Sequence, residues 1–186
     1  MPTLHQITSP LASSYKSVRL RALADTPSAF GSTYARESQF TEADWQQRTA
    51  NLCTPRSIGY LAHHEEEYCG IAVAFLKEQN PQHADLFSMW VAPEHRHTGT
   101  GRLLIDAIES WARNSGADTL QLMVTNSNLP AIAFYQRLGY TPTGRTEPYP
   151  NDPALIEYEM SKPSSNRTRY GGCMTGVPHP SLLCEG

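Results

Sequence analysis

The stretch best suited to chemistry is VAPEHRHTGTGR at residues 91–102, which joins an apolar run to a long amphipathic segment. The first N–H groups of a helix have no partner within the helix and carry the positive end of its dipole, so they attract phosphate. Gly99 and Gly101 have no Cβ to hold an anion away, and Arg96 and Arg102 can add charge. These residues predict a pyrophosphate site; a tight turn with an ordinary helix cap is the alternative.

The spacing of this segment separates it from the familiar nucleotide loops. Arg-x-x-Gly-x-Gly matches neither the Gly-x-Gly-x-x-Gly of dinucleotide-binding proteins nor the Walker loop that ends in Gly-Lys-Ser/Thr. We therefore expect a pyrophosphate that belongs neither to a nicotinamide cofactor nor to a nucleoside triphosphate.

The residues around the loop predict the elements that position it. Residues 101–115 carry one apolar stripe at helical spacing, and Gly116 follows where a C-terminal cap belongs. Ahead of the loop, three strand-like runs separated by turn residues indicate an antiparallel meander. These runs cover residues 57–63, 68–76 and 84–91. Beyond the helix we expect a strand at 119–124, a helix at 131–138 and a last strand at 154–160.

The first fifty residues are predicted to be mainly helical. A strand at 4–8 precedes a helix at 13–25, which Pro27 ends. Thr41 and Asp44 have the spacing of a capping box, which opens a short helix that ends near residue 50.

Composition narrows the class of protein. A chain of 186 residues suits one domain with its own core. The formal charge of -3, from 15 Lys+Arg and 18 Asp+Glu with no basic block, argues against nucleic-acid and membrane-surface partners. With no signal-like N-terminus and no apolar stretch long enough for a bilayer, we expect a cytoplasmic protein. The four cysteines are scattered singly, which indicates neither a metal site nor a disulfide framework.

Two motifs resemble those of the GNAT superfamily of N-acetyltransferases. Val91-x-Pro93-x-x-Arg96-x-x-Gly99-x-Gly101 resembles its acetyl-CoA loop. Asn128-x-x-Ala131-x-x-Phe134-Tyr135-x-x-x-Gly139-Tyr140 is similar to its second signature. The resemblance covers residues 3–162, and residues 57–140 carry almost all of it. The departures are His97 where glycine is frequent, Pro130 after the asparagine, and Tyr140 in place of phenylalanine.

The resemblance implies an α+β fold in which helices flank a mixed, mostly antiparallel sheet with one splayed strand pair. The pantetheine arm of acetyl-CoA would enter the gap and contact the backbone of Met89, Trp90 and Val91. The backbone amides of Arg96, His97, Thr98, Gly99, Thr100 and Gly101 would hold the pyrophosphate, with Arg102 reaching a phosphate and Asn128 and Tyr135 facing the cofactor.

The resemblance also assigns Tyr135 as the general acid that protonates the leaving thiolate; packing as a core aromatic is its alternative. A backbone N–H near Trp90 or Val91 is expected to stabilise the oxyanion. The general base is open among four carboxylates, Asp85, Glu147, Asp152 and Glu157. We take Asp85, on the strand ahead of the loop, as the candidate, although acidic residues on solvated strands are usually surface charges.

The expected function is direct transfer of an acetyl group from acetyl-CoA, without a metal, to the primary amine of a small molecule. Phe30, Tyr34 and Trp45 are either walls of the acceptor pocket or core residues. The alternatives are a protein N-terminal or lysine acetyltransferase and a non-catalytic acyl-CoA sensor. A homodimer is common among similar proteins. We expect one domain at residues 1–162 and a flexible tail at 163–186.

Overall fold

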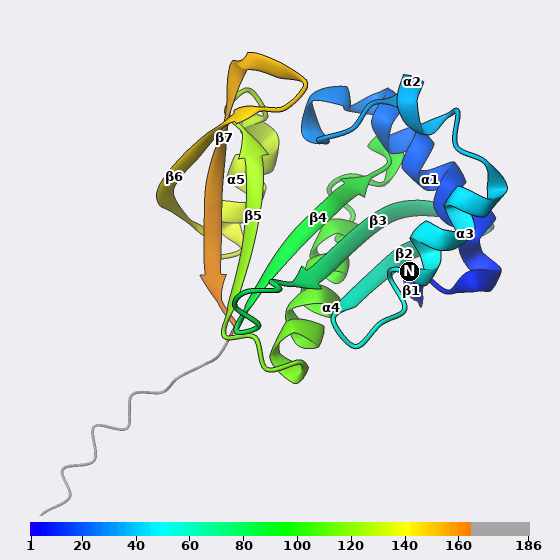
Figure 1. Ribbon diagram of the computed structural model, residues 1–186, viewed down its shortest axis with the longest axis horizontal. Coiled ribbons are helices and arrows are strands. Elements are labelled where there is room, and N and C mark those ends of the chain that lie inside the picture. Colours follow the sequence, from blue (N-terminus) through cyan, green and yellow to red (C-terminus); the bar gives the residue numbers. More distant parts are fainter. Residues whose placement is uncertain (165–186) are drawn as a thin grey trace, which may run out of the picture.

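The computed structural model describes residues 1–164, and a seven-stranded sheet with helices on both faces forms the body of the molecule (Figure 1). Its helices are α1 (Ala12–Asp25), α2 (Tyr34–Glu37), α3 (Glu42–Ala50), α4 (Thr100–Asn114) and α5 (Leu129–Arg137). Its strands are β1 (Thr3–Gln6), β2 (Ser57–His64), β3 (Glu67–Leu76), β4 (His83–Val91), β5 (Thr119–Thr125), β6 (Thr141–Tyr149) and β7 (Asp152–Pro163). The predicted domain boundary at 162 falls at the end of β7, and residues 165–186 of the expected tail lie outside the described residues.

The order of the strands is β1-β2-β3-β4-β5-β7-β6. Within the described residues every neighbouring pair is antiparallel except β4 and β5, which are parallel. The expected α+β class, with a mixed and mostly antiparallel sheet, is confirmed. The meander over β2, β3 and β4 is confirmed as well.

The core lies where helices cover both faces of the middle strands. Residues 69–74 of β3 are buried without interruption, which requires cover on both sides of the strand. Helices α1 and α4 supply much of it, since both contact β3. Leu104 of α4 lies against Gly70, where an added Cβ would meet the leucine side chain at 3.0 Å.

Three predicted helix ends are confirmed at atomic detail. The Thr41 hydroxyl accepts from the Asp44 N–H at 3.2 Å, while the Asp44 carboxylate accepts from the Thr41 N–H at 2.7 Å. Asn128 caps α5 by accepting from the N–H of Ala131 at 3.3 Å, with Pro130 in the first turn. Gly116 follows α4 in the left-handed region with a φ of 83°.

Tyr140, which stands in place of a phenylalanine, takes part in a contact between α4 and the last residues of β7. Its hydroxyl donates to the Glu109 carboxylate at 3.1 Å, and the same carboxylate pairs with Lys162 of β7 at 2.8 Å. The extra oxygen of tyrosine therefore has a buried acceptor.

Strand β6 is the element that the sequence pattern did not predict. Its sequence TPTGRTEPY contains two prolines and a glycine, and its outward residues are exposed. Proline is tolerated on an edge strand because one side of the backbone has no partner there, and β6 is the edge strand next to β7.

None of the helices among residues 1–164 combines the length and the apolar character needed to cross a bilayer.

Candidate functional site

Strands β4 and β5 are paired over a short stretch and then separate. Their parallel ladder ends at Asp85 and Gln121, although both strands continue. Between Phe87 and Trp90, β4 has one residue more than the facing part of β3, and Ser88 lies in this bulge with a left-handed φ of 53°. The unpaired edges of β4 and β5 therefore bound an open gap in the sheet (Figure 1).

The start of α4 borders this gap and presents unpaired N–H groups. His97 and Gly99 both have left-handed backbones, with φ of 64° and 92°, and no side chain caps the helix at Thr100. Within residues 1–164, the N–H groups of residues 97–102 donate no hydrogen bond of normal geometry. The left-handed φ at His97 explains why glycine is frequent at this position in similar loops.

Short contacts fix the loop and bring α5 close to it. The Thr98 hydroxyl donates to the carbonyl of His95 at 2.7 Å and lies 2.9 Å from the Thr100 hydroxyl. A Cβ added at Gly101 would lie 3.2 Å from the ring of Phe134, so this glycine permits the close approach of the two helices.

The two arginines predicted to add charge here are held by other protein groups. Arg96 forms an ion pair with Asp25 and donates to the carbonyl of Val91 at 2.9 Å. Trp90 donates to the same Asp25 carboxylate at 2.9 Å. Arg102 pairs with Asp106 one turn along α4. The backbone amides of the loop are therefore free donors, and the exposed Arg102 uses only its Nε atom in this pair, so its prediction as a phosphate contact stays open.

The Asp25 carboxylate is the common partner of the strand end and the loop. Partial burial alone would raise its pKa, but hydrogen bonds from Thr26, Trp90 and Arg96 hold it below the ordinary value of 3.8. Asp25 therefore stays ionised at neutral pH and anchors the loop to the end of α1.

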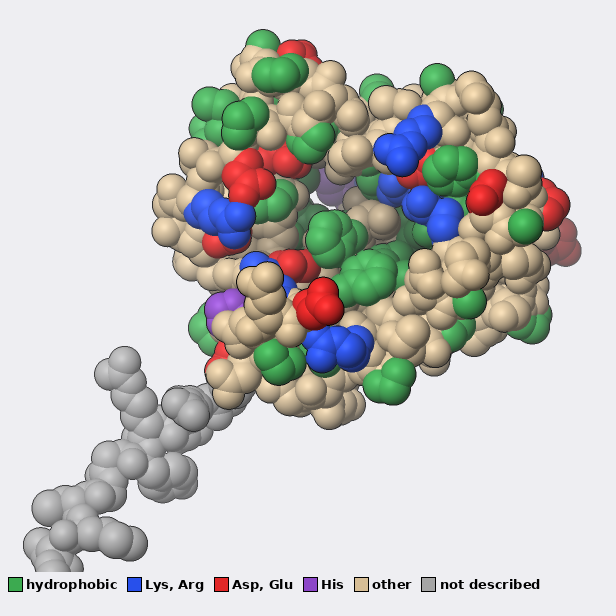
Figure 2. Space-filling view, viewed as in Figure 1, with side chains coloured by type: hydrophobic (Ala, Val, Ile, Leu, Met, Phe, Trp, Pro, Cys, Tyr) green, Lys and Arg blue, Asp and Glu red, His purple; other side chains and the backbone are tan. Residues whose placement is uncertain are grey.

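A cavity of about 510 Å³ opens at the gap. Leu122 and Val124 alternate with Met123 and Thr125 along β5, so their side chains point to opposite faces of the sheet. All four line the cavity, which therefore passes through the gap from one face to the other. Figure 2 shows the resulting hollow between the β6–β7 side and the helical side of the molecule.

Tyr135 and Asn128, both predicted site residues, line this cavity. Tyr135 is 7% exposed, and its hydroxyl forms no hydrogen bond with a protein group among the described residues. Burial raises the pKa of the Tyr135 phenol above its ordinary value of 10.0, so the hydroxyl keeps its proton throughout the neutral range. The structure thus places a protonated donor beside the gap.

A row of polar residues crosses three strands on the acidic side of the cavity. Thr125 of β5 and Glu147 of β6 are both register partners of Glu157 on β7, so the three side chains share a face. All three line the cavity. Glu147 pairs with Arg145, whereas Glu157 has no hydrogen bond or ion pair within residues 1–164. Burial, together with the nearby Glu147 charge, raises the pKa of Glu157 above the ordinary value of 4.5.

Asp85 lies outside this cavity. It pairs with Lys77 at 3.4 Å and borders a neighbouring hollow of about 250 Å³, which Glu159 also lines. Burial raises the pKa of Asp85, against the opposing effect of the Lys77 charge. Tyr135 and Asp85 are therefore not brought together by the structure.

The helical wall of the cavity contains a buried ion pair that was not expected. Arg19 of α1 donates to both carboxylate oxygens of Glu37, at 3.0 and 2.8 Å, and to the Ser88 hydroxyl at 3.0 Å. Its guanidinium lies 4.7 Å from the centroid of the Phe30 ring. This cluster ties α1 and α2 to the bulge in β4. A charged residue on the apolar face of α1 is the one signal in the sequence that pointed to it.

Replacing Arg19 by Met is expected to destabilise the fold strongly. Glu37 is 1% exposed and would keep only Arg48, at 3.6 Å, so the loss should be about 3–5 kcal/mol. Urea unfolding measures it, with Lys16→Met on the same helix as the control. That substitution removes a surface ion pair to Glu42 and should cost less than about 1 kcal/mol. Equal losses in both variants would contradict a structural role for the buried pair.

The three aromatic residues proposed for the acceptor pocket separate in the structure. Phe30 is buried and lines the cavity, Trp45 is a fully buried core residue, and Tyr34 is exposed outside the cavity lining.

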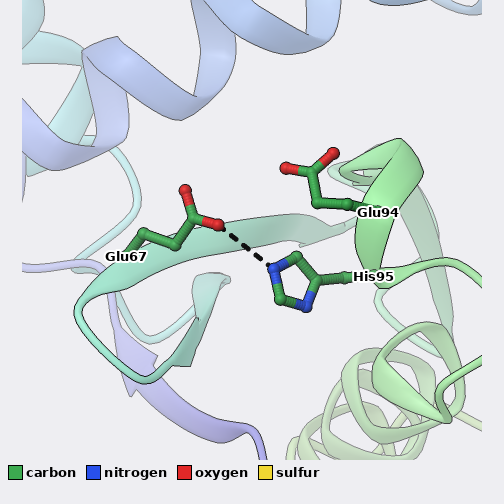
Figure 3. A group of neighbouring side chains, drawn as sticks. All are labelled: Glu67, Glu94 and His95. Carbon is green, nitrogen blue, oxygen red and sulfur yellow. Dashed lines mark hydrogen bonds and ion pairs between the residues drawn. The ribbon is translucent and has the colours of Figure 1, made fainter.

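A group of carboxylates with a histidine lies away from the gap, at the start of β3 and after β4. Glu67, Glu94 and His95 bring their ligand atoms within 4.8 Å of one another (Figure 3). Arg21 already supplies a positive charge there, since it pairs with Glu67 at 3.4 Å and with Glu94 at 2.8 Å. These residues serve as a surface ion-pair network.

Comparison with known proteins finds acetyltransferases both among sequence relatives and among solved structures with a similar fold. Streptothricin acetyltransferase of Streptomyces lavendulae is 50% identical over 50 residues, which cover 27% of this chain and 26% of that protein. The crystal structure of nourseothricin acetyltransferase is 33% identical, with a TM-score of 0.56 over 60% of this chain and 67% of that one. YncA from Salmonella typhimurium, solved with its cofactor acetyl-CoA, is 14% identical and shares the fold, with a TM-score of 0.72 over 97% of this chain and 99% of that one.

Eight curated relatives are matched over part of their length, since the chain spans between 16% and 48% of each of them. The family match is broader and covers residues 20–140, which include the loop, the gap and both signature motifs. This match, on a fold with the splayed strand pair that the resemblance implied, shows that the chain belongs to the Acetyltransferase (GNAT) family.

Proposed function

We propose that the chain transfers the acetyl group of acetyl-CoA directly to the primary amine of a small molecule, in a complex that holds both substrates. The observation that carries this proposal is the cavity through the gap between β4 and β5. Tyr135, Glu157 and Thr125 line it, and so does Met89, which lies against Gly101 at the start of α4.

The residues around the gap fit the donor substrate. The unpaired N–H groups of residues 97–102 suit the pyrophosphate of coenzyme A, and the unpaired edge of β4 from residue 86 to 91 suits the amides of its pantetheine arm. Acetyl-CoA supplies an acetyl group activated as a thioester. A β4 main-chain N–H at Trp90 or Val91 would stabilise the oxyanion that develops during transfer.

Glu157 is the general base in this proposal. An alkylamine with a pKa near ~10.4 is almost entirely protonated at pH 7, so freeing its lone pair costs roughly 4–5 kcal/mol. Glu157 has no protein partner within the described residues, and burial with the nearby Glu147 charge raises its pKa, which makes it a stronger base than an ordinary carboxylate. Asp85 is the second candidate, and its ion pair with Lys77 makes it the less available of the two.

Tyr135 is the general acid. The thiolate that leaves has a pKa near ~8.5, below that of a phenol, so proton transfer from Tyr135 is favourable only as the C–S bond breaks. The Tyr135 hydroxyl has no protein acceptor among residues 1–164, so its proton is available to the leaving sulfur.

A small acceptor is favoured over a protein by the dimensions of the cavity. Its volume of about 510 Å³ must hold the acetyl end of the donor as well as the acceptor. The walls on both sides, from α2 to the β6–β7 turn, enclose a space of the size typical of small-molecule sites. The names of the streptothricin and nourseothricin acetyltransferases point to small-molecule acceptors in similar proteins.

The test is release of free thiol from acetyl-CoA in the presence of a panel of amines, together with calorimetry of coenzyme A binding. We expect release with at least one small amine and none without an amine. Binding without release for any small amine or for peptides with free N-termini would favour an acyl-CoA sensor. Release with peptides alone would favour a protein acetyltransferase.

Replacing Gly99 by Val is expected to weaken coenzyme A binding at least about tenfold, or ~1.4 kcal/mol. The left-handed φ of 92° at Gly99 is unfavourable for valine, so the loop must rearrange and the N–H groups must turn away. Gly144→Val is the matched control, because Gly144 has a φ of 91°, equally open surroundings and a place on β6. Calorimetry should show normal binding by the control, and equal weakening in both variants would refute the assignment of the loop.

A further inference from the structure

The walls of the cavity carry charges of opposite sign. Arg36 and Arg48 line it from the helical side, and Glu147 and Glu157 line it from β6 and β7. Figure 2 shows basic side chains on the helical side of the hollow and acidic side chains on the opposite side. We propose that the acceptor carries an acidic group, a carboxylate or a phosphate, in addition to the amine that is acetylated. This inference rests on the proposed function and names its substrate class.

Arg48 presents a fixed guanidinium with an unused donor. The group lies 5.4 Å from the ring centroids of both Phe40 and Trp45, which hold its plane in one orientation. Its Nε atom is buried and has no hydrogen-bond partner within residues 1–164. A buried N–H without an acceptor is unfavourable, and a ligand anion at this wall would supply one.

The positive charge of this wall is only partly neutralised by the protein. Arg19 and Arg48 share the single carboxylate of Glu37, at 2.8 and 3.6 Å. The Arg36 side chain has no ion pair or hydrogen bond with any described residue and lines the same cavity. Three guanidinium groups therefore face one carboxylate, and the excess attracts an anion. Arginine also matches the geometry of carboxylate and phosphate oxygens with paired N–H groups.

The opposite wall is built to receive the amine. Thr125 is 2% exposed, lines the cavity, and its hydroxyl oxygen has no hydrogen-bond partner among the described residues. It shares a row with Glu157, which also lacks a protein partner. An ammonium group has three N–H donors, and these two acceptors satisfy two of them.

The basic and the acidic wall together disfavour a polyamine as the acceptor. A polyamine would bring a second cation toward Arg36 and Arg48, where like charges repel. The phosphates of coenzyme A are an unsuitable occupant of the basic wall, because the donors that suit its pyrophosphate lie at the start of α4. An acceptor with one amine and one acidic group satisfies both walls at once.

Matched acceptors test this inference by steady-state kinetics with acetyl-CoA. The pairs are 4-aminobutyrate against butylamine for the carboxylate and O-phosphoethanolamine against ethanolamine for the phosphate, with putrescine as the polyamine. We expect kcat/KM to be at least about tenfold higher for the acidic member of one pair, which also identifies the acidic group. Putrescine should be a poorer acceptor than that acidic member.

The arginines are tested with the same pairs. Arg36→Gln and Arg48→Gln should each reduce the preference for the acidic acceptor by roughly tenfold, through its KM. Arg113→Gln, an exposed change at the far end of α4, should leave the preference unchanged. Equal kcat/KM within both pairs would overturn the inference while leaving the acetyltransferase intact. A higher KM for acetyl-CoA in the Arg36 and Arg48 variants, with the preference retained, would overturn it as well. No thiol release with any amine would instead remove the proposed function, and this inference with it.

Discussion

Replacing Tyr135 by Phe is expected to lower kcat by about 10²–10⁴-fold, the usual contribution of general acid catalysis. The change removes one oxygen from a buried ring, so packing and coenzyme A binding should be nearly retained. Without the phenol the thiolate must leave unprotonated or wait for water. The defect should shrink as the pH rises above ~8.5, where a thiolate is the stable form of the leaving group.

The measurement is the pH profile of thiol release by the Tyr135→Phe variant with a good acceptor. Tyr140→Phe is the matched control, because Tyr140 lies next to Tyr135 and its hydroxyl donates to Glu109, away from the gap. Its kcat should be close to that of the wild type, with a modest loss of stability. A full rate in Tyr135→Phe at neutral pH would make this tyrosine a packing residue only.

Replacing Glu157 by Gln is expected to lower kcat/KM by about 10²–10³-fold, because the amide cannot accept a proton from the ammonium group. In the wild type, activity should rise with pH as Glu157 ionises, and the variant should lose this limb of the profile. Glu66→Gln, an exposed change in the β2–β3 turn, is the control and should keep the wild-type rate. A wild-type rate in Glu157→Gln would show that Glu157 is not the base.

The Glu157→Gln substitution should stabilise the fold at neutral pH, although it lowers the activity. The pKa of Glu157 is higher in the folded protein than its ordinary value of 4.5, so the folded state binds more protons between these two values. Wild-type stability therefore falls as the pH rises through this window, and the glutamine variant does not suffer the loss. Glu157→Gln should be more stable than the wild type at pH 7 and no more stable at pH 4, as urea unfolding at both values would show.

Much of the cofactor side of the site was predictable because its signals are local in the sequence. A strand end, a loop with two glycines and the apolar stripe of a helix follow one another around residues 91–115. The same short segment therefore predicts both the local fold and the pyrophosphate site. The caps at Thr41 and Asn128 depend on contacts three residues apart, and both were predicted correctly.

The acceptor side was not predictable to the same degree, since it depends on register between distant strands. Glu157 meets Thr125 and Glu147 only through the pairing of β7 with its two neighbours, and the sequence contains no signal for that pairing. The sequence therefore left four carboxylates open for the base. Arg19, whose contacts reach 69 residues along the chain to Ser88, was missed for the same reason.

The outer edge of the sheet has a consequence for self-association. Strand β6 offers Pro142 and Pro148, which have no N–H to donate, and Gly144 interrupts the ladder between them with a φ of 91°. An incoming strand from another copy would find no continuous row of donors and acceptors along β6. Addition of further strands at this edge of the sheet, and growth into fibres, is therefore disfavoured. A homodimer of this chain is therefore expected to form through a different surface.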